Sequence, residues 1–207
     1  MNYDDYIPTR HSLILRLKNW EDQGSWQDFF NTYWKFIYGV AIKTGLTDAE
    51  AQDVVQETVI TVAKKIKDFQ VGSDRGSFKA WLTRTTKWRI GDQFRKRTQA
   101  QASHSPPTNG SARTSTVERV PDPASLEMDA SWEKAWEQNL LEVALEKVKA
   151  KVDGDAFQMF HLHIIQQWPA AKVAATTGAK VAQVYFAKYK VSRLLKKEIA
   201  RLNKDLI

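Results

Sequence analysis

The residues best suited to chemistry in this sequence are cations gathered in one C-terminal segment. From Lys180 to Lys204 a single acid, Glu198, stands among eight basic residues: Lys180, Lys188, Lys190, Arg193, Lys196, Lys197, Arg201 and Lys204. A helix with this excess of positive charge suits the phosphate backbone of a nucleic acid. The alternative is a solvated basic face on an ordinary terminal helix.

The residues before this segment favour the nucleic-acid interpretation. Ala170 to Thr176 predicts a short helix that Pro169 opens, and Thr177-Gly178-Ala179 predicts a tight turn. Two helices joined by a glycine-containing turn form a helix-turn-helix, whose second helix enters the major groove of DNA.

A second basic segment runs from Ser77 to Arg97. Its only acid is Asp92, and its basic residues are Lys79, Arg84, Lys87, Arg89, Arg95, Lys96 and Arg97. Phe78, Trp81, Leu82 and Thr85 have the spacing of a buried helix face. Trp88 lies at the edge of that face, so it is either a core residue or an exposed ring that stacks on an unpaired base.

A polar and acidic segment precedes this one in the chain. It contains Asp48, Glu50, Asp53, Gln56 and Glu57. Acids near a helix start are stabilised by the helix dipole, which is one explanation for them. The other is a protein-docking surface that is separate from the basic surfaces.

The elements that must position these groups are all predicted to be helices. Thr9 caps the first, Thr47 with Glu50 forms a capping box for the third, and Ser77 caps the fourth. The first helix is expected to carry Leu13, Ile14, Leu15 and Leu17, and the others are expected at about 25–44, 48–66, 78–97, 132–151, 156–167, 170–176 and 180–204. No long stretch alternates with a period of two, so the predicted fold class is all-α.

The sequence divides at a stretch without aromatic residues. Four of the six prolines lie between Gln99 and Ala130, where Ser, Thr, Asn and Gly are also frequent. Such a stretch buries too little apolar surface to offset its ordering entropy. We therefore expect two small helical domains, 1–98 and 131–207, joined by a flexible linker at 99–130, with the helix-turn-helix in the second domain.

Composition narrows the class of protein further. The 207 residues carry a formal net charge of +7 and no cysteine, which excludes disulfides, thiolate metal ligands and a cysteine nucleophile. His161 and His163 are two residues apart and point to different sides of a helix, so no metal site or cofactor is predicted.

No apolar run reaches the roughly 20 residues of a membrane span, and a cytoplasmic protein is expected. Most of the eight tryptophans should be buried.

The order of several short motifs resembles a bacterial RNA polymerase sigma factor of the sigma-70 family. The motifs are Asp53-Val54-Val55-Gln56-Glu57, Phe78-x-x-Trp81-Leu82 and Asp92-x-x-Arg95-Lys96, followed by the linker and the helix-turn-helix. The two-module size is similar to the extracytoplasmic function (ECF) group. Trp88 departs from that group, many members of which have asparagine there.

The resemblance implies a role for three sets of residues. Core polymerase would bind at Asp53, Gln56 and Glu57. The promoter −10 element would be bound by Arg75, Ser77, Arg84, Lys87, Trp88 and Arg95. The −35 element would be bound by Lys180, Gln183, Tyr185, Lys188 and Lys190. An anti-sigma factor is a further candidate partner, and no enzymatic activity is implied.

Two alternatives to a sigma factor stay open from the sequence alone. A stand-alone helix-turn-helix regulator would bind duplex DNA tightly without polymerase. A helical enzyme or adaptor is the third class, although the sequence has no phosphate-binding glycine loop and no nucleophile placed beside a base.

Overall fold

The computed structural model describes residues 10–70, 77–103 and 130–204, and these residues form helices and connecting loops with no strand. The all-α prediction is therefore confirmed. The chain divides into two compact units, and the division falls after Asn139, within a helix. None of the helices in the described ranges combines the length and apolar character needed to cross a bilayer.

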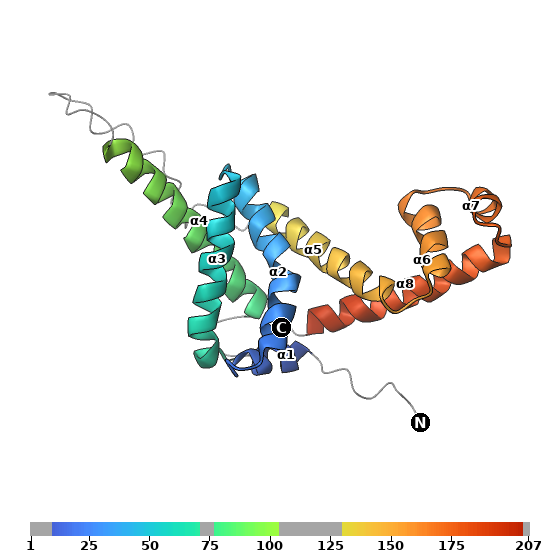
Figure 1. Ribbon diagram of the computed structural model, residues 1–207, viewed down its shortest axis with the longest axis horizontal. Coiled ribbons are helices and arrows are strands. Elements are labelled where there is room, and N and C mark those ends of the chain that lie inside the picture. The colour runs from blue at the N-terminus through green and yellow to red at the C-terminus, as the bar shows by residue number, and fades with distance from the viewer. Residues whose placement is uncertain (1–9, 71–76, 104–129, 205–207) are drawn as a thin grey trace. The chain divides into compact units, whose positions relative to one another are not determined.

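Unit 1 contains four helices and the first half of a fifth. They are α1 (Arg10–Leu17), α2 (Gln23–Lys43), α3 (Asp48–Lys65), α4 (Phe78–Ser103) and α5 (Ala130–Lys149), with a 3-10 turn at Ile66–Asp68 after α3. α3 packs against both α2 and α4 (Figure 1). Their core combines aliphatic side chains, such as Val54 and Leu82, with an aromatic cluster around the buried Phe78 ring.

Local capping explains where several of these helices begin. The Thr47 hydroxyl accepts from the Glu50 N–H at 3.4 Å, and the Glu50 carboxylate accepts from the Thr47 N–H at 2.8 Å. The predicted capping box of α3 is thus confirmed. Ser77 caps α4 by accepting from the Ala80 N–H. Asp22, which the sequence analysis passed over, caps α2 through the Ser25 N–H and also binds Arg16.

The boundaries of two helices differ from the prediction. α4 continues past Arg97 to Ser103, because the intervening Thr, Gln and Ala residues tolerate a helix and the first prolines come only at Pro106 and Pro107. α5 begins at Ala130. The predicted linker at 99–130 therefore has helix at both of its ends, and its residues 104–129 lie outside the described ranges.

Unit 2 continues α5 into α6 (Gly154–Phe160), a π-helical turn (His161–Ile165), α7 (Ala170–Thr177) and α8 (Val181–Lys204). The prediction of a single helix at 156–167 is wrong in its second half. There the α-helix gives way to the π-helical turn, and Gln167 takes a positive φ of 57°. Pro169 precedes α7 as its N-cap residue rather than as its first helical residue.

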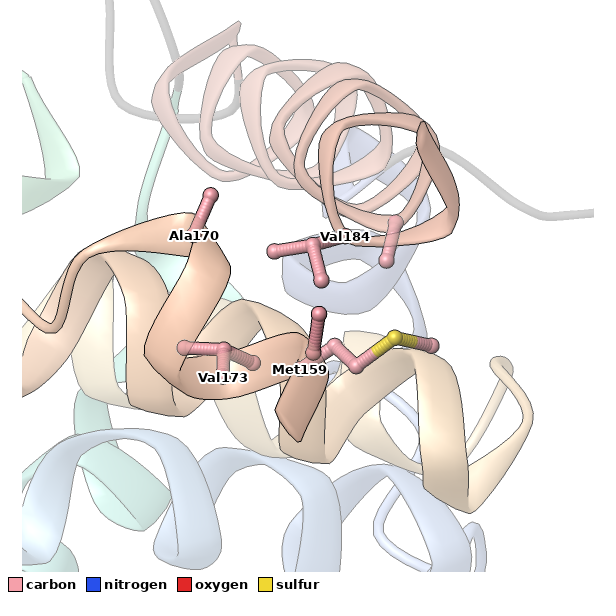
Figure 2. Close-up of a cluster of buried hydrophobic side chains, with 6 residues drawn as sticks. Met159, Ala170, Val173 and Val184 are labelled. Atoms are coloured by element: carbon pink, nitrogen blue, oxygen red, sulfur yellow. The ribbon is translucent and has the colours of Figure 1, made fainter. Parts of the chain in front are cut away.

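The turn between α7 and α8 depends on Gly178. This residue has φ +68°, a left-handed conformation that glycine adopts without a side-chain clash. The turn brings α7 and α8 together over a small core of Met159, Ala170, Val173, Ala174, Val184 and Ala187 (Figure 2). The opposite face of α8 is thereby left outside this core.

We predict that unit 1 depends on Phe78 more than on Trp81. The sequence places both on the core face, but Trp81 is only half-buried. Phe78→Ala should lower the free energy of unfolding of unit 1 by about 3–5 kcal/mol, and Trp81→Ala should cost less. Urea titration of the full chain, with hydrogen exchange of α2 and α4 as the reporter of unit 1, measures both losses.

The matched control is Leu15→Ala, which shortens an exposed apolar side chain on α1. It should change the free energy of unfolding by no more than about 0.5 kcal/mol. Equal losses for Leu15→Ala and Phe78→Ala would contradict the aromatic core described here.

Candidate nucleic-acid and docking surfaces

A groove between α2 and α3 gathers part of the predicted docking set. Its volume is about 810 Å³, and it is lined by Phe30, Trp34, Tyr38, Asp48, Gln52, Asp53, Val55, Gln56, Val59 and Ile60. The Phe30 and Trp34 rings stack 6.1 Å apart on its α2 side. The Tyr38 hydroxyl donates to Asp48 at 2.5 Å, and this bond raises the pKa of the tyrosine. The groove therefore combines apolar side chains with exposed carboxylate and amide groups on α3.

Asp53 and Gln56 lie in this groove, but Glu57 is engaged elsewhere. The Glu57 carboxylate lies 3.7 Å from Nη1 of Arg89 on α4. Arg89 in turn binds the Thr61 hydroxyl through Nε and Nη2, at 3.1 and 2.7 Å, and Asp92 at 3.1 Å. The structure thus brings two of the three predicted docking residues together and places the third in an ion-pair network between α3 and α4.

A second hollow lies beside α4 and collects aromatic and basic groups. Its volume is about 360 Å³, and it is lined by Thr61, Lys65, Asp68, Phe69, Gln70, Trp81, Arg84, Thr85 and Trp88. The Trp88 side chain is 56% exposed, so its interpretation as a core residue is wrong. Arg84 and Trp88 stand one helical turn apart on the same face of α4. A planar base could stack on the ring while the guanidinium binds a phosphate.

The other predicted −10 residues are divided between different surroundings. Lys87 faces away from the hollow, with its Nζ 5.8 Å from the centre of the Trp132 ring on α5. Arg95 pairs with Asp92, and Ser77 serves as the cap of α4. Arg75 lies outside the described residues.

The first half of α5 packs onto unit 1 through two tryptophans that the sequence analysis did not assign to this domain. The Trp136 ring stacks on Tyr33 at 5.6 Å and meets Phe36 edge to face at 4.9 Å. Asn139 donates to the Thr32 carbonyl at 2.8 Å. Trp132 and Trp136 are the two buried tryptophans among those the structure describes, so the expectation that most tryptophans form the core is wrong.

The predicted −35 residues all lie on or next to α8, in unit 2. Lys180, Lys188 and Lys190 are exposed. The Gln183 side chain accepts from the Lys180 N–H at 2.7 Å and so closes the start of the helix. The Tyr185 ring meets His163 edge to face at 5.7 Å.

The prediction from the sequence did not include two exposed aromatic rings on α8. Phe186 and Tyr189 are both largely solvent-exposed. Their sequence signal is indirect: Val184, Ala187 and Val191 have core spacing, and residues two positions from a core position point outward on a helix.

An ion pair that the sequence did not reveal joins α3 to the far end of α4. Nε of Arg97 donates to the Glu50 carboxylate at 2.8 Å, and the Thr47 N–H donates to the same group. Together they lower the pKa of Glu50 from 4.5 to about 2, with the Arg97 bond as the larger cause. In the described ranges, no group of three or more His, Asp and Glu side chains could hold a metal ion.

Comparison with known families finds a match within unit 1. Residues 29–100 match the family described as Sigma-70 region 2. The match covers most of α2, all of α3 and nearly all of α4, and hence both the groove and the α4 hollow. This part of the chain is therefore similar to sigma-70 region 2. No curated protein matches the chain.

We predict that the Glu50–Arg97 pair makes stability depend on acid pH. Because the pKa of Glu50 is lower in the folded protein, its contribution is complete above about pH 4.5 and is lost as the pH falls toward about 2. Glu50→Gln should lower stability at pH 6 and make this part of the acid dependence disappear. Thermal unfolding of the full chain and of the variant between pH 2 and 6 measures how the stability of each depends on pH. Parallel pH profiles with a constant offset would contradict it.

Proposed function

We propose that the protein is a sigma factor of the ECF type, which binds core RNA polymerase, directs it to −35 and −10 promoter elements and assists strand opening. The observation that carries the proposal is the sigma-70 region 2 match over residues 29–100, which contain a docking groove and a basic aromatic hollow. In this proposal the protein catalyses no covalent reaction itself and acts in the cytoplasm.

The α2–α3 groove is suited to a helical partner with basic residues. Phe30, Trp34 and Ile60 offer apolar anchors, and Asp53 provides negative charge beside them. Aromatic anchors surrounded by polar groups are the usual organisation of a protein interface. The negative charge of the groove would also disfavour DNA, so polymerase and promoter would not compete for it.

The α4 hollow is suited to an unpaired base. Extruding a base from a duplex costs a few kcal/mol, and stacking returns about 1–3 kcal/mol per base. One hollow can therefore roughly balance one extruded base but cannot hold a long bubble open. This balance is the physical reason for a small factor to need polymerase for promoter opening.

The α7–turn–α8 segment would supply the second contact with DNA. Its three-residue turn and exposed lysines have the arrangement of a helix-turn-helix reader. A chain that joins this reader to the region 2 domain raises the effective concentration of the second DNA contact once the first has formed.

We predict that core binding depends on Asp53 and Gln56 more than on Glu57. The double variant Asp53→Ala, Gln56→Ala should weaken binding of purified core polymerase about tenfold, which is roughly 1.4 kcal/mol. Glu57→Ala should weaken it less, because that carboxylate is paired with Arg89. Titration of labelled protein with core polymerase measures the dissociation constants.

Glu142→Ala is the matched control for this prediction, since it removes an exposed acid from α5. It should leave core binding unchanged. A stable protein that fails to bind core polymerase even without substitution would overturn the proposed function and leave the stand-alone regulator.

We predict that Trp88 contributes to strand opening through its ring. Trp88→Ala should weaken binding of the polymerase complex to a single-stranded −10 oligonucleotide about five- to hundredfold, as expected for loss of one stacked base. Trp88→Phe should retain part of the affinity. Fluorescence anisotropy of the labelled oligonucleotide measures the effect.

The control is Trp20→Ala, which removes another exposed tryptophan from unit 1. It should not alter binding of the oligonucleotide. If Trp88→Ala behaves in the same way as Trp20→Ala, the α4 hollow is not a base-binding site.

A further inference from the structure

The outer face of α8 carries three large aromatic side chains that unit 2 does not bury. Tyr185, Phe186 and Tyr189 are 54%, 67% and 65% exposed. They stand at positions i, i+1 and i+4 and so form one continuous patch on the helix. Contiguous exposed apolar surface of this kind marks an interaction site more often than chance.

The core of unit 2 explains why these rings point outward. Val184, Ala187 and Val191 are buried on the opposite side of the same helix. Because an α-helix advances about 100° per residue, the three rings lie across the helix axis from this core. The His163 ring holds Tyr185 edge to face at 5.7 Å, and His163 is itself anchored to the Trp168 carbonyl at 2.8 Å.

Positive charge borders the aromatic patch on two sides. Lys188 and Lys190 are exposed and, being two residues apart, flank Tyr189 on opposite sides of the helix. Arg193 continues the patch along the helix at i+4 from Tyr189. Glu198, the only acid from 180 to 204, is buried and paired with Arg201 at 2.6 Å. The patch therefore complements a ligand that is apolar in its centre and anionic at both edges.

The major groove of A·T-rich DNA has this character. Phosphates line both of its walls, and the 5-methyl group of thymine is the apolar feature on its floor. We propose that the aromatic face of α8 gives the protein specificity for thymine, with Phe186 and Tyr189 in contact with thymine methyl groups and Lys188 and Lys190 on the flanking phosphates. This inference rests on the proposed function, since it specifies what the −35 reader recognises.

Removal of single methyl groups from DNA tests the proposal. Duplexes bound by the full chain at low ionic strength are selected from a library randomised over about two helical turns, and each thymine of the preferred duplex is then replaced by deoxyuridine. At least one replacement should weaken binding about fourfold, as expected for one buried methyl group. Phe186→Ala combined with Tyr189→Ala should abolish this difference between thymine and deoxyuridine.

Lys188→Gln is the control variant, because it removes a cation and leaves the aromatic patch intact. It should weaken binding of the thymine and deoxyuridine duplexes by the same factor and flatten the salt dependence. Circular dichroism of each variant checks that unit 2 remains folded.

Three results would overturn the proposal. If no deoxyuridine replacement weakens binding, duplex recognition does not use methyl groups, and the proposed sigma function stands unaffected. If the double aromatic variant changes only the sedimentation of the protein, the patch is an interface between copies of the chain. If the full chain binds no duplex either alone or with core polymerase, the −35 part of the proposed function fails together with the inference.

Discussion

The Phe78 ring, at the first residue of α4, packs against the rings of Phe29, Tyr33, Phe69 and Trp81. These rings come from α2, from the segment after α3 and from α4 itself. Their burial fixes where α4 starts relative to the rest of unit 1, and a helix that is fixed at its start has a determined outward face. The position of every basic residue on α4 follows from this contact.

The Glu50–Arg97 ion pair fixes the same helix near its other end. It joins the first turn of α3 to α4 five turns beyond Phe78. With both ends held, Arg84 and Trp88 stand beside the hollow, whereas Lys87 lies against α5. The aromatic contacts and the ion pair together fix the orientation of α4.

The two candidate surfaces of unit 1 carry opposite charge. The α2–α3 groove presents Asp53 beside apolar side chains, whereas the exposed side of α4 presents Arg84 and Arg95. An anionic rim attracts basic protein surfaces and repels phosphate, and a cationic face does the opposite. The region 2 match over residues 29–100 includes both surfaces.

Features set by neighbouring residues could be predicted from the sequence. The capping box of Thr47 and Glu50, the cap at Ser77 and the tight turn at Gly178 depend on contacts within a few residues. The all-α class follows from apolar periodicity in the same way. These features were confirmed because local geometry leaves few alternatives.

Features set by packing between distant segments could not be predicted. Trp88 and Trp136 are the same type of residue in the sequence, but their surroundings differ. The Trp136 ring of α5 is buried against α2, whereas the Trp88 ring remains exposed. Likewise, nothing in the spacing of Glu57 and Arg89 indicates that they form a pair. The composition of the candidate sites depends on such long-range contacts, which a single sequence does not record.

The most direct test of the sigma-factor account is transcription reconstituted from purified core polymerase, the full chain and a promoter library randomised over the −35 and −10 positions. The account predicts that transcripts start only when the protein is present, and that the active promoters share two sequence elements at a fixed separation. Initiation that is independent of the protein, or a protein that leaves core polymerase unbound with the library present, would contradict it.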